Sequence, residues 1–274
     1  MKYLALSILC SVAVANLLKF FSRDKSHSSM YMFLGNYFIA SLAGLLFTLN
    51  SDFHFHSTDL IIPAVSGFFF LMGFVYYLKN ISVNGLSISV STFRMSLVIP
   101  VAGSMLIFKE YLYLINYVGI LLIFSAFVML GRERKKYNVF LLAILFLIAG
   151  FADFFPKLYT RFSNHNPNSF YLALNFLFAF IFNLIFISFS KIKTSFKSFM
   201  NGLIIGIPNF FNAFFLMKSF DTIAGTLAYP VLSASTVILT MAADFFIWKK
   251  RFSKRECILY SFIIAGMVLA VASF

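Results

Sequence analysis

Ten apolar runs, each about the length that crosses a membrane, occupy almost the whole sequence. An α-helix needs about 20 apolar residues to span a hydrocarbon core of about 30 Å. The runs cover approximately residues 3–21, 30–48, 61–78, 84–107, 113–130, 138–158, 168–190, 200–218, 224–248 and 256–273. Apolar and polar residues do not alternate within them, which excludes a transmembrane β-barrel. We therefore expect an all-α integral membrane protein with ten transmembrane helices.

The charged residues indicate how such a protein is oriented rather than what it binds. Only 11% of residues are charged, with 22 Lys and Arg against 9 Asp and Glu. Most basic residues lie in alternate loops between the runs, namely Arg23, Lys25, Arg132, Arg134, Lys135, Lys136, Lys191, Lys193, Lys197, Lys249, Lys250, Arg251, Lys254 and Arg255. This is the pattern that orients membrane proteins, so it argues against nucleic-acid binding. Applied literally, it places these loops in the cytoplasm and both termini outside.

The sequence repeats itself. At an offset of 140 residues, the segment 84–130 aligns without a gap with 224–270, and Lys109 aligns with Lys249. Upstream, Asn36 pairs with Asn175. We therefore expect two five-helix repeats, over residues 1–131 and 132–274. Five is an odd number, so the second repeat enters the membrane from the opposite side, and the repeats are inverted. Inverted repeats are common in transporters that open a central site to each side in turn.

The chain resembles the EamA-type units of the drug/metabolite transporter superfamily. The residues that carry the resemblance are Pro100 in an apolar helix, followed by "LIFKEYLYLINYVGILLIFSAFVML" with Glu110 after Lys109. The second copy departs from the pattern, with Thr240 at the place of the proline and Lys250 at the place of the acid. The likeness covers nearly the whole chain and concerns architecture.

The resemblance implies a ten-helix exporter or exchanger of small organic metabolites, with a cavity lined mainly by helices 1, 3, 4, 6, 8 and 9. It also implies cytoplasmic termini, which contradicts the charge pattern of the loops. Orientation therefore stays open at this point. We expect a bacterial inner membrane protein of unknown oligomeric state.

Arg94 is the charged residue that most needs an explanation, because it lies near the middle of the run 84–107. An arginine at that depth costs at least about 2.5 kcal/mol on insertion scales, so it must face protein or water. On a helix it shares a stripe with Ser87 and Ser91. A guanidinium binds carboxylate or phosphate groups through two hydrogen bonds. We interpret the three residues as substrate contacts for an anionic or zwitterionic solute. The alternative is a structural pairing of Arg94 with Asp153, Asp244 or main-chain carbonyls.

Asp153 is the candidate for proton coupling. A carboxyl group inside a membrane can release and regain a proton during a transport cycle. The alternative is an ion pair with Lys157, which follows one helical turn later in the favourable order. Asn16 is the counterpart of Asp153 in the first repeat and is a further substrate-binding candidate.

Three prolines interrupt apolar helices and are candidate hinges or cavity walls: Pro100, Pro208 and Pro230. Each removes a main-chain donor from its helix, and unpaired carbonyls at membrane depth occur only beside protein or a cavity. Further polar candidates for substrate binding near these prolines are Asn209, Asn212 and Tyr229.

No cofactor or metal site is indicated. His54 and His56 in "DFHFH" lack further ligands, and no phosphate-binding loop or catalytic spacing occurs. The sequence therefore predicts a secondary transporter of small polar metabolites, such as amino acids or organic anions, which acts by alternating access. The alternatives are an integral-membrane enzyme, which would need clustered acids or histidines, and a scaffold without transport activity.

Overall fold

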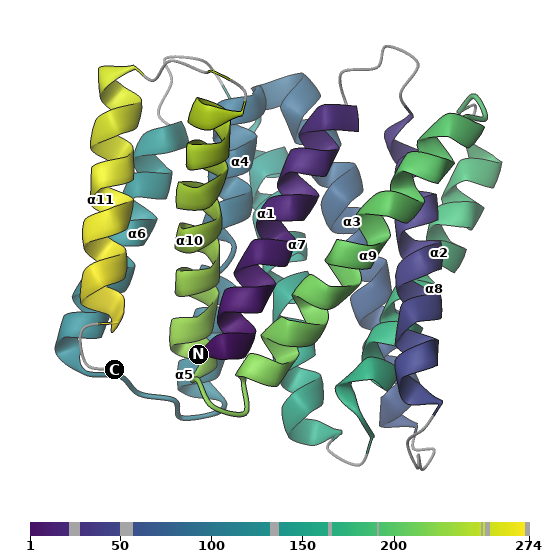
Figure 1. Ribbon diagram of the computed structural model, residues 1–274, viewed down its shortest axis with the longest axis horizontal. Coiled ribbons are helices and arrows are strands. Elements are labelled where there is room, and N and C mark those ends of the chain that lie inside the picture. Colours follow the sequence, from purple (N-terminus) through teal and green to yellow (C-terminus); the bar gives the residue numbers. More distant parts are fainter. Residues whose placement is uncertain are drawn as a thin grey trace. The chain divides into compact units, whose positions relative to one another are not determined.

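The protein is built from α-helices throughout the part of the chain that the computed structural model describes, which is residues 1–21, 28–49, 57–131, 137–163, 166–190, 192–247, 249 and 253–271 (Figure 1). The helices are α1 (Lys2–Phe21), α2 (Ser29–Thr48), α3 (Thr58–Asn84), α4 (Leu86–Met95), α5 (Val98–Leu106), α6 (Leu114–Gly131), α7 (Val139–Phe162), α8 (Asn168–Phe189), α9 (Phe196–Ser219), α10 (Gly225–Phe246) and α11 (Lys254–Val271).

The predicted membrane architecture is confirmed. Eight helical segments in the described ranges are long and apolar enough to cross a membrane, and two shorter apolar helices cover Leu114–Met129 and Cys257–Ala270. Together they correspond to the ten apolar runs of the sequence. One difference is informative: the run at 84–107 forms two consecutive helices, α4 and α5, rather than one.

The helices group into two compact units that do not follow the two halves of the sequence. Unit 1 contains Met1–Leu71 and Phe155–Asp221, and unit 2 contains Met72–Phe154 and Thr222–Phe274. Helices α3 and α7 each contribute to both units. Each unit therefore combines elements from both sequence halves. The predicted boundary between the two repeats, at residues 131 and 132, was drawn from sequence similarity and does not describe how the helices pack. It stays a prediction.

In unit 1, the equivalent helices of the two repeats, α2 and α8, pack antiparallel. The Thr48 hydroxyl at the end of α2 donates to the Ser169 hydroxyl at the start of α8, at 3.1 Å. At the other end of the pair, the Asn183 amide of α8 donates to the carbonyl of Met30 at the start of α2, at 3.0 Å. Each helix therefore begins where its counterpart ends, which is the arrangement that inverted repeats require.

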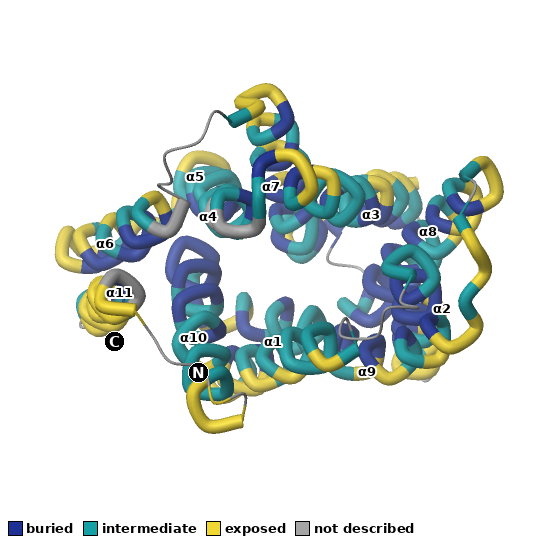
Figure 2. Tube along the Cα trace, turned by 90° about the horizontal axis from the view of Figure 1, so that it is seen from above, coloured by how far each residue is buried: buried dark blue, intermediate teal, exposed yellow. Residues whose placement is uncertain are grey.

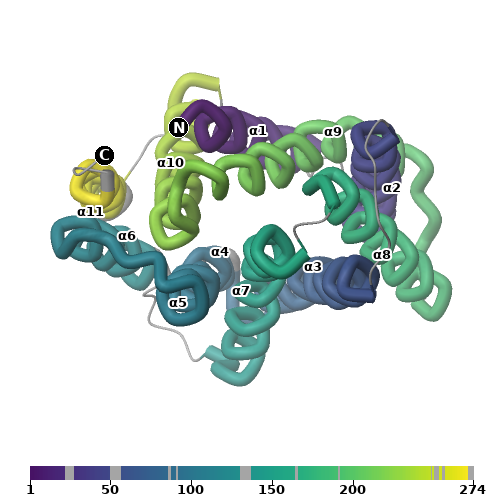
Figure 3. Tube along the Cα trace, turned by 90° about the horizontal axis from the view of Figure 1, so that it is seen from below, coloured from purple at the N-terminus to yellow at the C-terminus, as the bar shows by residue number. Residues whose placement is uncertain are grey.

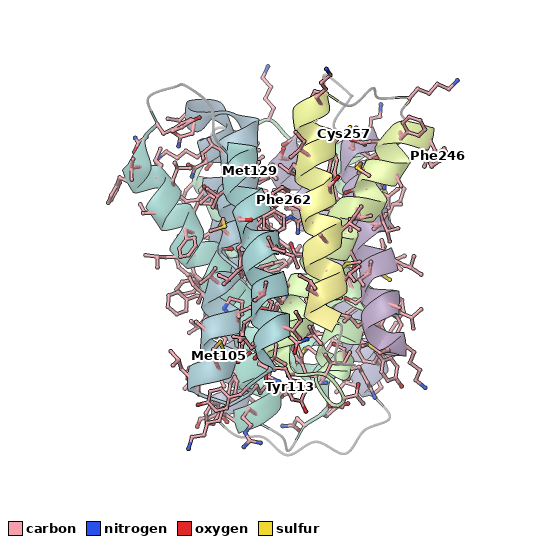
Figure 4. All side chains as sticks on the ribbon, turned by 90° about the vertical axis from the view of Figure 1, so that its left-hand side faces the viewer. Met105, Tyr113, Met129, Phe246, Cys257 and Phe262 are labelled. Carbon is pink, nitrogen blue, oxygen red and sulfur yellow. The ribbon has the colours of Figure 1, made fainter. Side chains whose placement is uncertain are left out.

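Unit 2 repeats this arrangement with α6 and α11. The Asn116 amide near the start of α6 donates to the carbonyl of Ala270 near the end of α11, at 2.9 Å. Two glycines allow the close approach, because a Cβ atom on Gly119 would lie 2.4 Å from the carbonyl oxygen of Gly266. Figures 3 and 4 show the two helices side by side, with Cys257 of α11 at the same end as Met129 of α6.

The linkers after α5 and α10 share an unusual backbone conformation. Lys109 has φ 54° and Lys249 has φ 51°, and these are the two non-glycine residues with positive φ in the described ranges. A left-handed conformation costs a residue with a Cβ atom about 1–2 kcal/mol. The two lysines are the pair that the offset of 140 residues aligned, so the backbone supports the repeat at the level of a single residue.

Burial differs sharply between the last two helices of unit 2. The first half of α10 is almost entirely buried, from Gly225 to Pro230, whereas α11 is largely exposed (Figure 2). In a membrane protein, an exposed apolar helix faces lipid and a buried one faces other helices. Among these helices, α10 is therefore the one placed to contribute to an internal site.

Candidate functional site

The break between α4 and α5 gives the region its local structure. Pro100 has no main-chain N–H, so a continuous helix through it would leave the Ser96 carbonyl without its donor. The chain instead ends α4 at Met95 and begins α5 at Val98, and the Ile99 N–H donates to the Ser96 carbonyl at 2.9 Å. Pro100 thereby lies in the first turn of a new helix, where no main-chain donor is needed.

The break places Arg94 in the last turn of α4. The chain keeps a right-handed helical conformation through Ser96 and Leu97, and the Leu97 N–H donates to the Arg94 carbonyl at 3.4 Å. The break is therefore a local change in the hydrogen-bond pattern of one membrane-spanning segment. Arg94 is half-buried beside it.

Helix α7 passes directly beside the break. A Cβ atom on Gly150 would lie 2.7 Å from the carbonyl oxygen of Ser96, and one on Gly103 would lie 2.4 Å from the Phe154 ring. Small residues such as these two glycines let helices approach closely within a membrane. This packing brings Asp153, three residues after Gly150, near the end of α4.

Arg94 interacts electrostatically with the Asp153 carboxylate of α7 and with the Tyr77 hydroxyl of α3. Asp153, like Arg94, is half-buried. The Tyr77 ring packs against Phe93, with 5.2 Å between the ring centroids, and this contact fixes Tyr77 next to the arginine.

Helix α10 completes the arrangement through Tyr229. Its side chain is 1% exposed, and its hydroxyl donates to the main-chain carbonyl of Asp153 at 2.8 Å. We call Arg94, Asp153, Tyr77 and Tyr229 the Arg94 cluster. The cluster joins four helices of unit 2 and combines one cation, one carboxylate and two phenols.

The structure thus brings together three of the sequence-predicted residues, Arg94, Asp153 and Tyr229, and adds Tyr77. Tyr77 was missed because its aromatic side chain resembles those of the other packing residues in its helix. Tyr77 lies one residue before the end of the apolar run 61–78, where a tyrosine is a weak signal, and only its electrostatic interaction with Arg94 distinguishes it. The side chains of Ser87 and Ser91 lie outside the described residues.

The three predicted asparagines, Asn16, Asn209 and Asn212, lie in unit 1. Asn209 donates to the Asn36 side chain at 3.1 Å, and Asn212 accepts from the Ser7 hydroxyl at 2.8 Å through its side chain. Asn16 donates to the carbonyl of Val12 one turn earlier, at 2.9 Å. The bonds of Asn209 and Asn212 connect α9 with α2 and α1, so these two side chains contribute to helix packing.

The other two prolines do not break their helices. Pro208 lies within α9 and Pro230 within α10, and both helices continue through them. Lys157 is 6% exposed, and its ammonium lies over the Phe220 ring at 4.7 Å from the centroid. The pairing of Lys157 with Asp153 stays a prediction. His54 and His56 lie outside the described residues.

Comparisons with known proteins bear on what this arrangement does. The model of the EamA-like transporter family matches residues 136–272, which is the second repeat. An uncharacterized protein of Haemophilus influenzae is 27% identical over 271 residues, covering 93% of this chain and 92% of its own. A solved crystal structure covers 98% of both chains with a TM-score of 0.69 at 16% identity, and this likeness concerns the fold alone.

These findings agree with the inverted, all-helical architecture and with a multi-pass protein embedded in the lipid bilayer. They also favour a protein that moves small molecules across the membrane over the alternatives of an enzyme or a scaffold. The chain therefore belongs to the EamA-like transporter family of the drug/metabolite transporter superfamily.

Proposed function

We propose that this protein exports or exchanges small polar metabolites, such as amino acids or organic anions, by alternating access. The Arg94 cluster is the substrate contact, with Arg94 binding the anionic group of the solute. The observation that carries the proposal is a half-buried guanidinium within a membrane-spanning segment, which interacts electrostatically with Tyr77 of α3 and Asp153 of α7.

The chemistry of Arg94 favours an anionic or zwitterionic solute. A guanidinium holds a carboxylate or phosphate group through two parallel hydrogen bonds, and these strengthen away from bulk water. The electrostatic partner that Arg94 has in this structure, Asp153, presents the same carboxylate chemistry. A solute carboxylate would compete with Asp153 for the arginine.

That competition suggests how the solute could be coupled to a proton. When a solute anion binds Arg94, Asp153 loses part of the positive potential that stabilises its ionised form, and protonation becomes easier. When the solute leaves, Arg94 again favours the ionised carboxylate, and the proton is released. Solute binding and protonation of Asp153 therefore favour each other through one charge pair, and Asp153 is the proposed coupling residue.

Alternating access is supported by the antiparallel packing of equivalent helices in each unit. Inverted repeats permit the same change to occur in either half and open opposite faces. Pro100 lies at an observed helix break and is the proposed hinge of the first repeat. Pro208 and Pro230 are secondary hinge candidates, because their helices are continuous. We place the protein in a bacterial inner membrane, in keeping with its bacterial relative.

Transport by purified protein in proteoliposomes tests the proposal. Radiolabelled amino acids, organic acids and nucleotides would be loaded inside, and efflux would be followed with and without a pH gradient. We expect at least one carboxylate-bearing solute to move faster than in protein-free liposomes, and Arg94→Ala to abolish this movement. Unchanged flux of every solute in the presence of the wild-type protein, or full activity of Arg94→Ala, would contradict the proposal.

A further inference from the structure

Glu110 fastens the linker between α5 and α6 to the start of α10. Its side-chain Oε2 accepts a hydrogen bond from the main-chain N–H of Gly225 at 2.6 Å, and its carbonyl accepts one from the Thr226 hydroxyl at 2.9 Å. The Glu110 N–H donates to the carbonyl of Ser104 at 3.1 Å, which ties the linker back to α5. All these residues belong to unit 2.

The contact caps α10 from elsewhere in the chain. The first N–H groups of a helix have no partner within it, and a local Ser, Thr, Asp or Asn usually supplies one. The residue at this position of α10 is Ala224, which makes no side-chain hydrogen bond. Glu110, 115 residues earlier, takes that place. Its charge also lies at the end of the helix where the macrodipole favours an anion.

The capped end of α10 is one turn from the Arg94 cluster. Tyr229 follows Gly225 by four residues and contacts Asp153 through its hydroxyl. Gly225, Thr226 and Tyr229 are all buried in the first half of α10. A shift of the start of α10 would therefore move Tyr229 and the hydrogen bond that it makes to α7.

The second repeat lacks the acid that makes this contact. Lys109 and Lys249 have nearly the same left-handed φ, so the two linkers begin with the same backbone conformation. The next residue is Glu110 in the first repeat and Lys250 in the second. A lysine side chain has no acceptor and cannot bind an N–H group. In inverted repeats, these two linkers face opposite sides of the membrane.

We propose that Glu110 is a one-sided latch. It holds the start of α10 to the α5–α6 linker at one membrane face, and it releases each time the transporter opens toward that face. Glu110 is a positioning residue, since it acts on the Arg94 cluster through α10. The proposal rests on the alternating-access function described above.

Cysteine labelling tests the latch without a known substrate. In a Cys10→Ala, Cys257→Ala background, Ala224→Cys places one thiol beside the latch. The rate of its reaction with a membrane-impermeant maleimide would be measured in proteoliposomes. A cap contributes about the equivalent of a tenfold change in an equilibrium, so we expect Glu110→Ala to raise the labelling rate about tenfold. Glu110→Gln keeps an acceptor oxygen and should raise it about threefold or less.

Asp221→Ala is the matched control, because Asp221 is an exposed carboxylate in the linker between α9 and α10, three residues before the labelled position 224. It should leave the labelling rate unchanged. The melting temperature in detergent and the split between KM and maximal flux would be measured for each variant. We expect Glu110→Ala to change maximal flux more than KM, and Glu110→Gln to restore most of it.

Each outcome is decisive. If Glu110→Ala labels at the wild-type rate, or if Asp221→Ala changes labelling equally, the latch is wrong even when transport is intact. If Glu110→Ala lowers the melting temperature while labelling of the folded fraction stays at the wild-type rate, Glu110 is only structural and the latch is wrong. If labelling changes as expected but the wild-type protein moves no solute, the latch stands and the transport proposal fails.

Discussion

The broken helix α4–α5 and the continuous helix α10 occupy equivalent positions in the two repeats, yet they accommodate a proline in different ways. Each contains a proline, at Pro100 and Pro230. Pro230 is the sixth residue of α10, where few helical hydrogen bonds precede it. Pro100 is the seventeenth residue of the run 84–107, and α4 ends and α5 begins just before it. Where a proline lies, rather than its presence, decides whether a membrane helix breaks.

The two helices also differ in charge. Arg94 lies in the last turn of α4, and its equivalent in α10 is Ala234, which is fully buried. The first repeat therefore supplies the cation of the Arg94 cluster, and the second supplies Asp153 together with Tyr229, whose hydroxyl donates to the Asp153 carbonyl.

Arg94 should show the largest effect. We expect Arg94→Ala to lower flux of the preferred solute about 100-fold, because the lost charged hydrogen bonds amount to about 3 kcal/mol. Arg94→Lys should recover only part of it, since lysine cannot form the paired contact. Initial rates in proteoliposomes measure both. The control is Lys79→Ala, which removes an exposed cation of unit 2 and should change flux less than twofold. Equal losses in Arg94→Ala and Lys79→Ala would refute a specific role for Arg94.

Asp153→Asn should separate movement of the solute from its coupling to protons. A gradient of one pH unit supplies about 1.4 kcal/mol per proton, which supports about tenfold accumulation of a solute coupled to one proton. We expect this accumulation to disappear in Asp153→Asn, because asparagine cannot exchange a proton, while solute exchange at equal pH continues. Asp244→Asn, in the later part of α10, should keep the coupling. Accumulation that persists in Asp153→Asn would mean that another group carries the proton.

The two prolines can be compared directly. Pro100→Ala restores an N–H that can bond the Ser96 carbonyl, so it favours a continuous helix through the break. We expect flux to fall about fivefold, in line with one main-chain hydrogen bond of about 1 kcal/mol. Pro230→Ala, in a helix that is already continuous, should change flux less than twofold. Parallel flux measurements decide this, and a larger effect at Pro230 would reverse the comparison.

Tyr229→Phe should have the smallest effect of the four. It removes the hydroxyl that bonds the Asp153 carbonyl but keeps the ring, and we expect about a threefold loss of flux, which corresponds to the lower part of the range for one hydrogen bond, about 0.6 kcal/mol. Tyr113→Phe, at an exposed tyrosine of the same unit, is the control. The same flux assay applies, and indistinguishable rates for Tyr229→Phe and wild type would show that the hydroxyl does not position Asp153.

Local sequence signals predicted the helices because membrane insertion imposes a strict length and polarity on each segment. The alignment of Lys109 with Lys249 paired two residues that share a left-handed backbone conformation in the structure, but the conformation itself was not predicted. Only part of the helix break could be predicted. Pro100 indicated that the helix would be interrupted. The residue at which α4 ends depends also on the new hydrogen bonds that start α5 and on the packing of Ser96 against Gly150.

The candidate site was less predictable, because polar residues in apolar helices have two uses. Asn209 and Asn212 carry the same chemistry as a substrate contact, and the structure shows them bonded between helices. No property of a single helix distinguishes the two uses. Arg94 could be recognised as a candidate because a charged side chain is tolerated in few environments inside a membrane protein. Tyr77 could not, because a tyrosine is tolerated in many.

The contact between Gly119 and Gly266 has a consequence for how the protein is made. Helix α6 emerges from the ribosome well before α11, and until residue 266 is inserted the groove at Gly119 has no partner to fill it. Unit 2 cannot be finished during translation of the first half. A nascent chain that stalls or is cut between the two helices would keep an unfilled surface within the bilayer, which is a feature that membrane proteases and insertion chaperones can recognise.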